Sequence, residues 1–166
     1  MVKMKIPVII AFLAAAAVGL WLLFSTDEKD RVRRQFDQLT EVVQKEEKEP
    51  PLTSAAKANR SKEFFTDPFT FISPAHDLQR EVPLRDLPAR MLALRSAYSI
   101  LELDFADMEI TLTSETTARV AATATLTGRI KTGDHTRDIQ ELNCHLEKQN
   151  DTWLFAGVEI VEVLAQ

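Results

Sequence analysis

Apolar and polar residues alternate along most of the C-terminal half of the chain, from Leu101 to Leu164. Four segments with this pattern follow one another, and short polar turns separate them. A period of two residues is typical of strands that bury one face of a sheet. The pattern therefore predicts a curved antiparallel meander of four strands. The residues expected to face inward are Leu103, Phe105, Ile110, Leu112, Val120, Ala122, Ala124, Leu126, Leu142, Cys144 and Leu146.

Irregularities in the alternation locate the features of this sheet. The phase slips by one residue near Ala106, which indicates a β-bulge. Gly133 lies in a predicted hairpin turn, where a positive φ is easily adopted. The last segment begins at Trp153 and is apolar on both faces except at Glu159 and Glu162. We therefore expect that segment in the middle of the sheet rather than at an edge.

Three stretches before residue 100 have the spacing of amphipathic helices. The first begins at the capping-box pattern of residues 25–28 and ends before Pro50, because proline interrupts a helix. The second covers residues 53–65, and the third begins at Asp86. The expected buried stripes are Val32, Phe36, Leu39 and Val43 in the first helix, Ala55, Ala56, Ala58, Phe64 and Phe65 in the second, and Leu87, Met91, Leu94 and Tyr98 in the third.

An uncharged run, Ile6–Phe24, precedes these elements. At about 1.5 Å per residue it is long enough to cross a hydrocarbon layer of roughly 30 Å. We expect a single transmembrane anchor in the inner (cytoplasmic) membrane, over residues 1–25, with residues 26–166 as a domain on the periplasmic or extracellular side. Lys3 and Lys5 favour this orientation. A cleavable signal peptide is the alternative interpretation.

Composition and charge exclude some classes of function. The net charge is −5, which disfavours a nucleic-acid surface because phosphate binding needs a basic stripe. No spacing of Cys, His, Asp or Glu predicts a metal site, and we expect no cofactor. Cys144 is the only cysteine, and on an inward strand position we expect it to be a small buried apolar residue.

Charged residues before the sheet offer weaker candidates for chemistry. A short apolar run, Phe69–Ile72, precedes an irregular stretch from Pro74 to Pro83. The adjacent pair His76-Asp77 falls in that stretch, and we interpret it as solvated rather than as an acid–base pair. The arginines of the third helix are expected on a solvated face; they are Arg85, Arg90 and Arg95.

The order of elements and two runs of residues resemble the nuclear transport factor 2-like superfamily, also called the SnoaL-like or cystatin-like cone. The runs are Ala118–Ala124 and Leu142–Phe155, with Asn150-Asp151-Thr152 where the family usually has a glycine. The resemblance implies an α+β cone with about three helices over the sheet and a cavity between them. The cavity lining that it implies is Tyr98, Phe105, Val120, Leu142, Cys144 and Trp153.

The resemblance leaves three classes of function open. Enzymes of the isomerase branch need a carboxylate inside the cone, and here only Asp104 or Asp107 could turn inward at the bulge, with Tyr98 offering a hydroxyl. The arrangement of anchor, helices and sheet also resembles a scaffold component of type IV secretion systems. We expect instead a non-catalytic membrane-anchored domain that binds an apolar ligand or a protein partner. A homodimer through the outer sheet face would use Thr111, Thr113, Thr123, Thr125 and Thr127.

Overall fold

The computed structural model describes residues 27–163, and at His76, Glu162 and Val163 it describes the backbone alone. The predicted anchor Ile6–Phe24 and the capping residue Ser25 lie outside the described residues. Within residues 27–163, no helix has both the length and the apolar character needed to cross a membrane.

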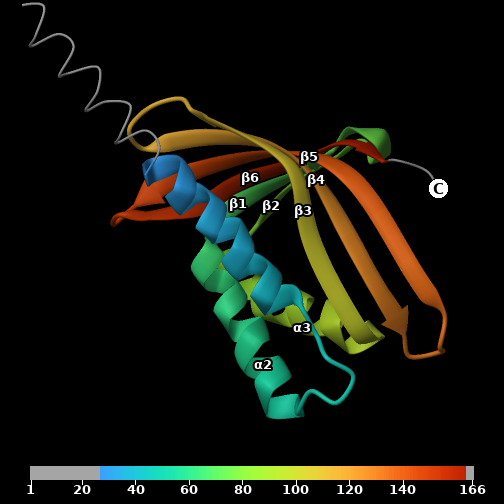
Figure 1. The fold of residues 1–166 in the computed structure, drawn as a ribbon. Helices are drawn as coiled ribbons and strands as arrows, with labels where there is room; N and C mark the ends of the chain where they lie inside the picture. Colours follow the sequence, from blue (N-terminus) through green and yellow to red (C-terminus); the bar gives the residue numbers. More distant parts are fainter. Residues whose placement is uncertain (1–26, 164–166) are drawn as a thin grey trace, which may run out of the picture.

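One six-stranded sheet forms the body of the domain, and Figure 1 shows its strong curvature. Its strands are β1 (Phe65–Ser73), β2 (Leu78–Val82), β3 (Tyr98–Leu112), β4 (Thr117–Ile130), β5 (His135–Gln149) and β6 (Thr152–Val163). Their order is β2-β1-β6-β5-β4-β3, and every neighbouring pair is antiparallel except β1 with β6. The predicted meander corresponds to β3–β6, and β6 lies inside the sheet as expected. The predicted number of four strands was wrong.

The two missed strands, β1 and β2, come from the stretch interpreted as a helix end and an irregular segment. Pro68 lies inside β1, and a proline inside an apolar run argues against a strand because it has no N–H for the ladder. β1 pairs in parallel with β6, with Phe71 opposite Val158, and antiparallel with β2. Such a pairing joins residues almost ninety positions apart, so no local sequence pattern predicts it.

The irregularities predicted for the meander are confirmed. The register between β3 and β4 shifts between Ala106 and Glu109, and Asp107 has a φ of 52° at that bulge. Gly133 has a φ of 104° in the β4–β5 turn. Asn150 and Asp151 both adopt positive φ in the turn between β5 and β6.

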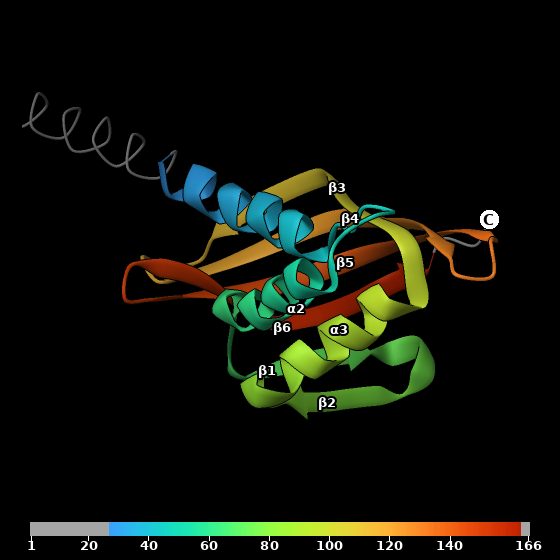
Figure 2. The ribbon, with the colours of Figure 1, turned by 90° about the horizontal axis from the view of Figure 1, so that it is seen from below.

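Helices cover one face of the sheet and leave the other uncovered, as Figures 1 and 2 show. They are a helix over residues 27–43, α2 (Pro51–Arg60) and α3 (Leu87–Ala97), with short 3-10 turns η1 (Ser61–Phe64), η2 (Pro74–His76) and η3 (Leu84–Asp86). α2 begins two residues earlier than predicted because Pro51 takes the first helical position, where a missing N–H costs nothing. Ala55 and Ala56 of α2 are exposed, contrary to the predicted stripe.

The main core lies between the 27–43 helix and strands β3–β6. The predicted stripe of that helix is buried, and the Phe36 ring makes edge contacts with Phe105 and Phe155 at centroid distances of 5.0 and 4.8 Å. Such aromatic pairs stabilise the fold by about 0.5–1.5 kcal/mol beyond what the burial of their surface contributes. A smaller core of Phe69, Val82 and Leu87 packs β1 and β2 against α3. The cone is therefore filled by its own side chains where the 27–43 helix covers it.

Candidate functional sites

The residues predicted to line a ligand cavity lie together in or against the main core. Val120, Cys144 and Trp153 are buried, and Tyr98, Phe105 and Leu142 are half-buried and pack against them. Burial raises the pKa of the Cys144 thiol to about 12, so it stays protonated and is not a nucleophile. A role of these six residues in ligand binding stays a prediction.

The two carboxylates considered for an enzyme site do not enter the cone. Asp104 is exposed and lies opposite Thr125, and Asp107 is exposed at the bulge. A general base inside the cone would need an inward carboxylate or imidazole. Neither aspartate meets that requirement in this structure.

Arg95 is the main correction to the predicted sites, because its exposed fraction is 0%. Its Nη1 donates to the carbonyl oxygens of Val42, Val43 and Gln44 at 2.7–2.8 Å, and so caps the C-terminal end of the 27–43 helix. Lys45, which follows that helix, donates from Nζ to the carbonyls of Arg95 and Tyr98 at the end of α3, at 2.7 and 2.6 Å. The end of each helix is therefore capped by a cation from the other helix or from the residues directly after it.

The charge of Arg95 is balanced by Glu49, whose side chain is 4% exposed. Glu49 accepts from Arg95 Nη2 and, at 3.0 Å, from Lys57 Nζ. Burial by itself raises the pKa of Glu49, but the hydrogen bonds and charges of these two cations outweigh it, and the pKa lies below its ordinary value. Helical spacing could not reveal this cluster, since it predicts which face a residue occupies but not what packs over that face.

A second polar cluster joins the start of the described chain to the β5–β6 turn. Glu28 accepts hydrogen bonds from Arg31 and Lys148, both at 2.9 Å, and from the indole Nε1 of Trp153 at 2.8 Å. Asp151 in the turn accepts from Arg31 at 2.7 Å and pairs with Lys148 at 3.1 Å. Trp153 thus fixes the last hairpin against the first helix.

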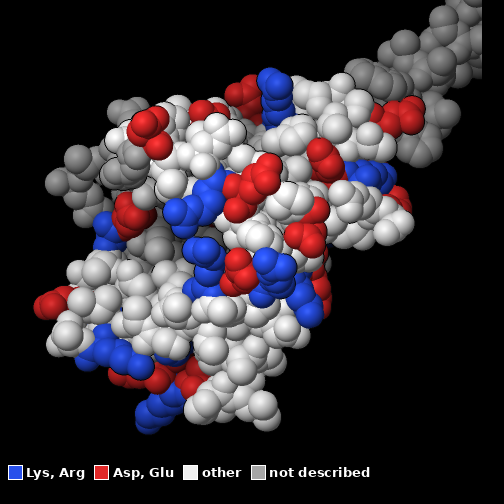
Figure 3. Space-filling model, turned by 180° about the vertical axis from the view of Figure 1, so that it is seen from behind, with Lys and Arg blue, Asp and Glu red and all other residues white. Residues whose placement is uncertain are grey.

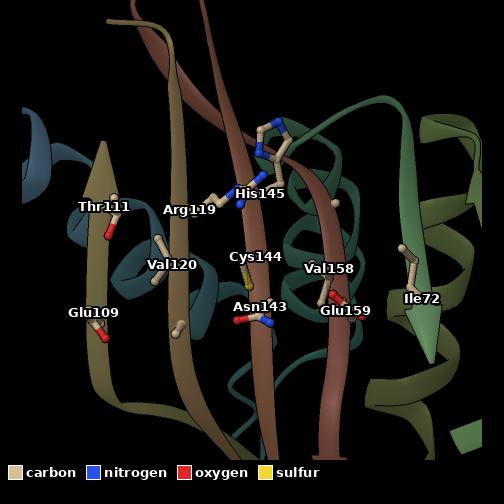
Figure 4. A pocket seen from close by; sticks show the side chains of 12 residues that line it. Ile72, Glu109, Thr111, Arg119, Val120, Asn143, Cys144, His145, Val158 and Glu159 are labelled. Carbon is tan, nitrogen blue, oxygen red and sulfur yellow. The ribbon is translucent and has the colours of Figure 1, made fainter. Parts of the chain in front are cut away.

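The uncovered face of the sheet carries a broad hollow with a volume of about 690 Å³. Figure 4 shows it spanning five strands, from Thr111 of β3 to Ile72 of β1. Its polar lining comes from outward positions of the strands and consists of Glu109, Thr111, Arg119, Asn143, His145 and Glu159. Ala121 and Gly157 lie among them and are too small to fill the space. We call this surface, with Ile72, the open sheet face.

Figure 3, a view from behind, shows charges of both signs intermingled on that surface of the molecule. The Arg119 side chain extends toward β5 beside His145 (Figure 4). Sequence reasoning predicted a threonine-rich outer face, and of those threonines Thr111 lines the hollow, whereas Thr113 lies in the β3–β4 turn and bonds Thr117 at 2.7 Å. The outward alternation positions of neighbouring strands were the signal that could have identified the other lining residues.

No metal-binding geometry accompanies these clusters: residues 27–163 contain no group of three or more Cys, His, Asp or Glu side chains placed to hold an ion. The His76 side chain is not described, and its neighbour Asp77 has a φ of 47°. The pair His76-Asp77 is therefore untested as a site.

Comparison with known proteins establishes the fold alone. No protein-family model matches the chain, and no curated protein matches it. Among solved structures, the Kfla4162 protein from Kribbella flavida is similar, with a TM-score of 0.70, 15% identity, and coverage of 86% of this chain and 94% of that one. A protein with a cystatin-like fold from Caulobacter vibrioides has a TM-score of 0.59 and 9% identity over 82% of this chain and 89% of its own.

An enzyme is also among the similar structures. A hexachlorocyclohexane dehydrochlorinase, LinA, matches with a TM-score of 0.63 and 9% identity over 86% of this chain and 93% of its own. These identities are too low to carry an activity across, because one fold hosts many unrelated functions. The predicted α+β cone of the nuclear transport factor 2-like and cystatin-like type is thus the fold of this domain.

Proposed function

We propose that this chain is a non-catalytic assembly domain that pairs with a second copy of itself through the open sheet face. The observation that carries the proposal is the difference between the two faces of the sheet. One face is covered by helices over an apolar core, and the other carries a broad hollow that no described element covers.

The chemistry of the open sheet face supports association with a copy of itself. It carries both signs of charge, with Arg119 in one cross-strand row and Glu109 and Glu159 in the next. A two-fold axis brings the same patch of each copy together, so a patch that carries both signs can be complementary to itself. The small residues Ala121 and Gly157 would admit side chains of the partner.

Localisation and the alternatives remain proposals from the sequence. Ile6–Phe24 would anchor the domain in the inner membrane, with the domain outside the cytoplasm, and membrane anchoring favours pairing because it concentrates the copies in two dimensions. The type IV secretion scaffold is one such assembly role. The competing proposal is an enzyme of the isomerase or dehydratase type, which the fold shared with LinA supports. Against it, the predicted cavity lining contains only two ionisable residues, Tyr98 and Cys144.

The test introduces a large charged side chain into the middle of the proposed interface. Ala121 is exposed on the open sheet face, and Ala121→Arg adds bulk and charge there without touching the core. The matched control is Ala55→Arg, the same change at an exposed position of α2 on the helix side. The measurement is the molar mass by light scattering coupled to size-exclusion chromatography.

We expect a dimer for the unaltered chain and for Ala55→Arg, and a monomer for Ala121→Arg. A two-fold axis would bring the two new arginines close together, and their like charges repel. If the dimer is only weakened, its fraction should fall further as the protein is diluted. A monomeric unaltered chain, or a dimer that survives Ala121→Arg, would contradict the proposal.

A further inference from the structure

Residues 44–50, which we call the strap, run between the end of the 27–43 helix and the start of α2. Residues 45–49 of the strap are all charged, and three alternate ones are each bonded to a different part of the domain. Lys45 caps α3 and pairs with Leu101 through two main-chain hydrogen bonds of 2.8 and 3.1 Å, Glu47 pairs with Arg129 of β4, and Glu49 pairs with Arg95 and Lys57. The strap is therefore held by ion pairs and hydrogen bonds rather than by apolar packing.

The environment of Glu49 has the character of an anion-binding site. Four of the hydrogen bonds of Arg95 go to fixed protein groups, which are the three carbonyls of residues 42–44 and the hydroxyl of Ser54. Its Nη2 is held by this framework and directed at the Glu49 carboxylate. A guanidinium fixed in this way is preorganised for a planar carboxylate.

Solvent can reach this site from one side. The Lys57 side chain is 27% exposed, whereas those of Glu49 and Arg95 are 4% and 0% exposed. Lys57 also donates to the carbonyl of Gln44 at 3.0 Å, so it keeps one partner when Glu49 leaves. A small anion arriving beside Lys57 would find two cations already in position.

We propose that Arg95 and Lys57 form a carboxylate-binding site that Glu49 occupies in this structure, and that a ligand carboxylate displaces Glu49 and releases the strap beyond Lys45. Gln44 and Lys45 stay in place through their own hydrogen bonds. A buried cation must keep a counter-charge, so exchange of one carboxylate for another is far cheaper than leaving the site empty. Glu49 acts as an internal competitor: the site is available to the ligand only in the fraction of molecules with Glu49 displaced, and the apparent affinity falls by that fraction. This site lies on the helix side of the sheet and is independent of the open sheet face.

The first experiment empties the site and supplies a carboxylate from solution. Acetate is the probe, and chloride of equal ionic strength is the reference. Glu49→Ala should gain thermal stability as acetate is added, because a ligand that binds only the folded state stabilises it by mass action. The matched control is Glu47→Ala, which removes a carboxylate from the same strap but leaves the site occupied. It should respond to acetate no more than the unaltered chain does.

The affinities provide the quantitative test. We expect acetate to bind Glu49→Ala at least about tenfold more tightly than the unaltered chain, because the internal competitor is gone. In the unaltered chain at saturating acetate, the amide of Glu49, which donates to the carbonyl of Glu46 at 3.2 Å, should exchange its hydrogen faster as this part of the strap is released. Absence of an acetate effect on Glu49→Ala, or equal effects on all three proteins, would overturn the proposal.

Glu49→Ala could fail to fold, since it leaves the buried charge of Arg95 without its partner. In that case acetate should restore the folded state in a titration, and chloride should not. Glu49→Gln serves as the second variant, because its amide oxygen still accepts from Arg95 while its charge is lost. It should fold and respond to acetate less than Glu49→Ala, and an equal response would place the acetate elsewhere.

Discussion

Trp153 ties the sheet to the first helix through both its ring and its single polar atom. The ring is 2% exposed within the core, and the indole N–H donates to Glu28 instead of being left unpaired. A buried donor without a partner costs about 1–3 kcal/mol. Glu28 is therefore a structural partner of the core and not a surface charge.

Close packing at Gly128 leads to a prediction at the same scale. A Cβ added there would lie 2.5 Å from Cδ1 of Tyr98 and 2.8 Å from the carbonyl oxygen of Ile100. Gly128→Ala must displace the half-buried Tyr98 ring and the β3 backbone, and overpacking of this kind costs about 1–3 kcal/mol. Urea unfolding should report that loss in the free energy of unfolding.

Gly157 provides the matched control for Gly128. A Cβ at Gly157 would meet its nearest atoms at 3.7 and 3.8 Å, which is ordinary contact. Because Gly157 lies in the proposed interface, both glycine variants are measured in the monomeric Ala121→Arg background. There Gly157→Ala should change the free energy of unfolding by less than about 0.5 kcal/mol. Equal losses in the two variants would mean that Gly128 is needed for some reason other than the Tyr98 contact.

Among the elements, the 27–43 helix is held at both ends by charged side chains from elsewhere in the chain. Its first turn is bonded to the β5–β6 turn through Glu28 and Arg31, and its last carbonyls are capped by Arg95. Arg31 and Lys148 lower the pKa of Asp151 to about 2 through hydrogen bonds. Burial raises the pKa of Glu28, and hydrogen bonds from Lys148, Trp153 and Arg31 outweigh this and lower it overall.

These shifts predict how stability depends on pH. Both carboxylates have folded-state pKa values below their unfolded values, which are about 3.9 for Asp and 4.3 for Glu. The stability they provide is therefore complete above about pH 5 and is lost as the pH falls toward about 2. Asp151→Asn should make the melting temperature depend less steeply on pH in that window.

Thermal melting between about pH 5 and pH 2 measures this slope. The control is Asp104→Asn, which removes an exposed carboxylate of β3 far from the turn. The melting temperature of this variant should depend on pH as steeply as that of the unaltered chain. If Asp151→Asn and the unaltered chain show the same slope, Asp151 does not stabilise the contact between helix and hairpin.

For the molecule as a whole, the two proposed sites occupy opposite faces of one sheet. The open sheet face carries the hollow, and the Glu49 site lies among the helices. Effects at distant sites without shared partners add within about 0.3–0.5 kcal/mol. The double variant Ala121→Arg with Glu49→Ala should therefore be monomeric and should show the acetate response of Glu49→Ala alone, as measured by light scattering and thermal melting. A response that changes with oligomeric state would show that the two faces are coupled.

The sequence by itself determined the strands β3–β6, the bulge after Ala106 and the buried stripe of the first helix. Each of these features depends on neighbours within a few residues, so periodicity and turn chemistry reveal it. Only the tertiary structure decided the parallel pairing of β1 with β6, the burial of Arg95 and the bond from Trp153 to Glu28. These contacts join residues between about fifty and more than one hundred positions apart, where the free energy depends on which surfaces meet in space and not on the order of residues along the chain.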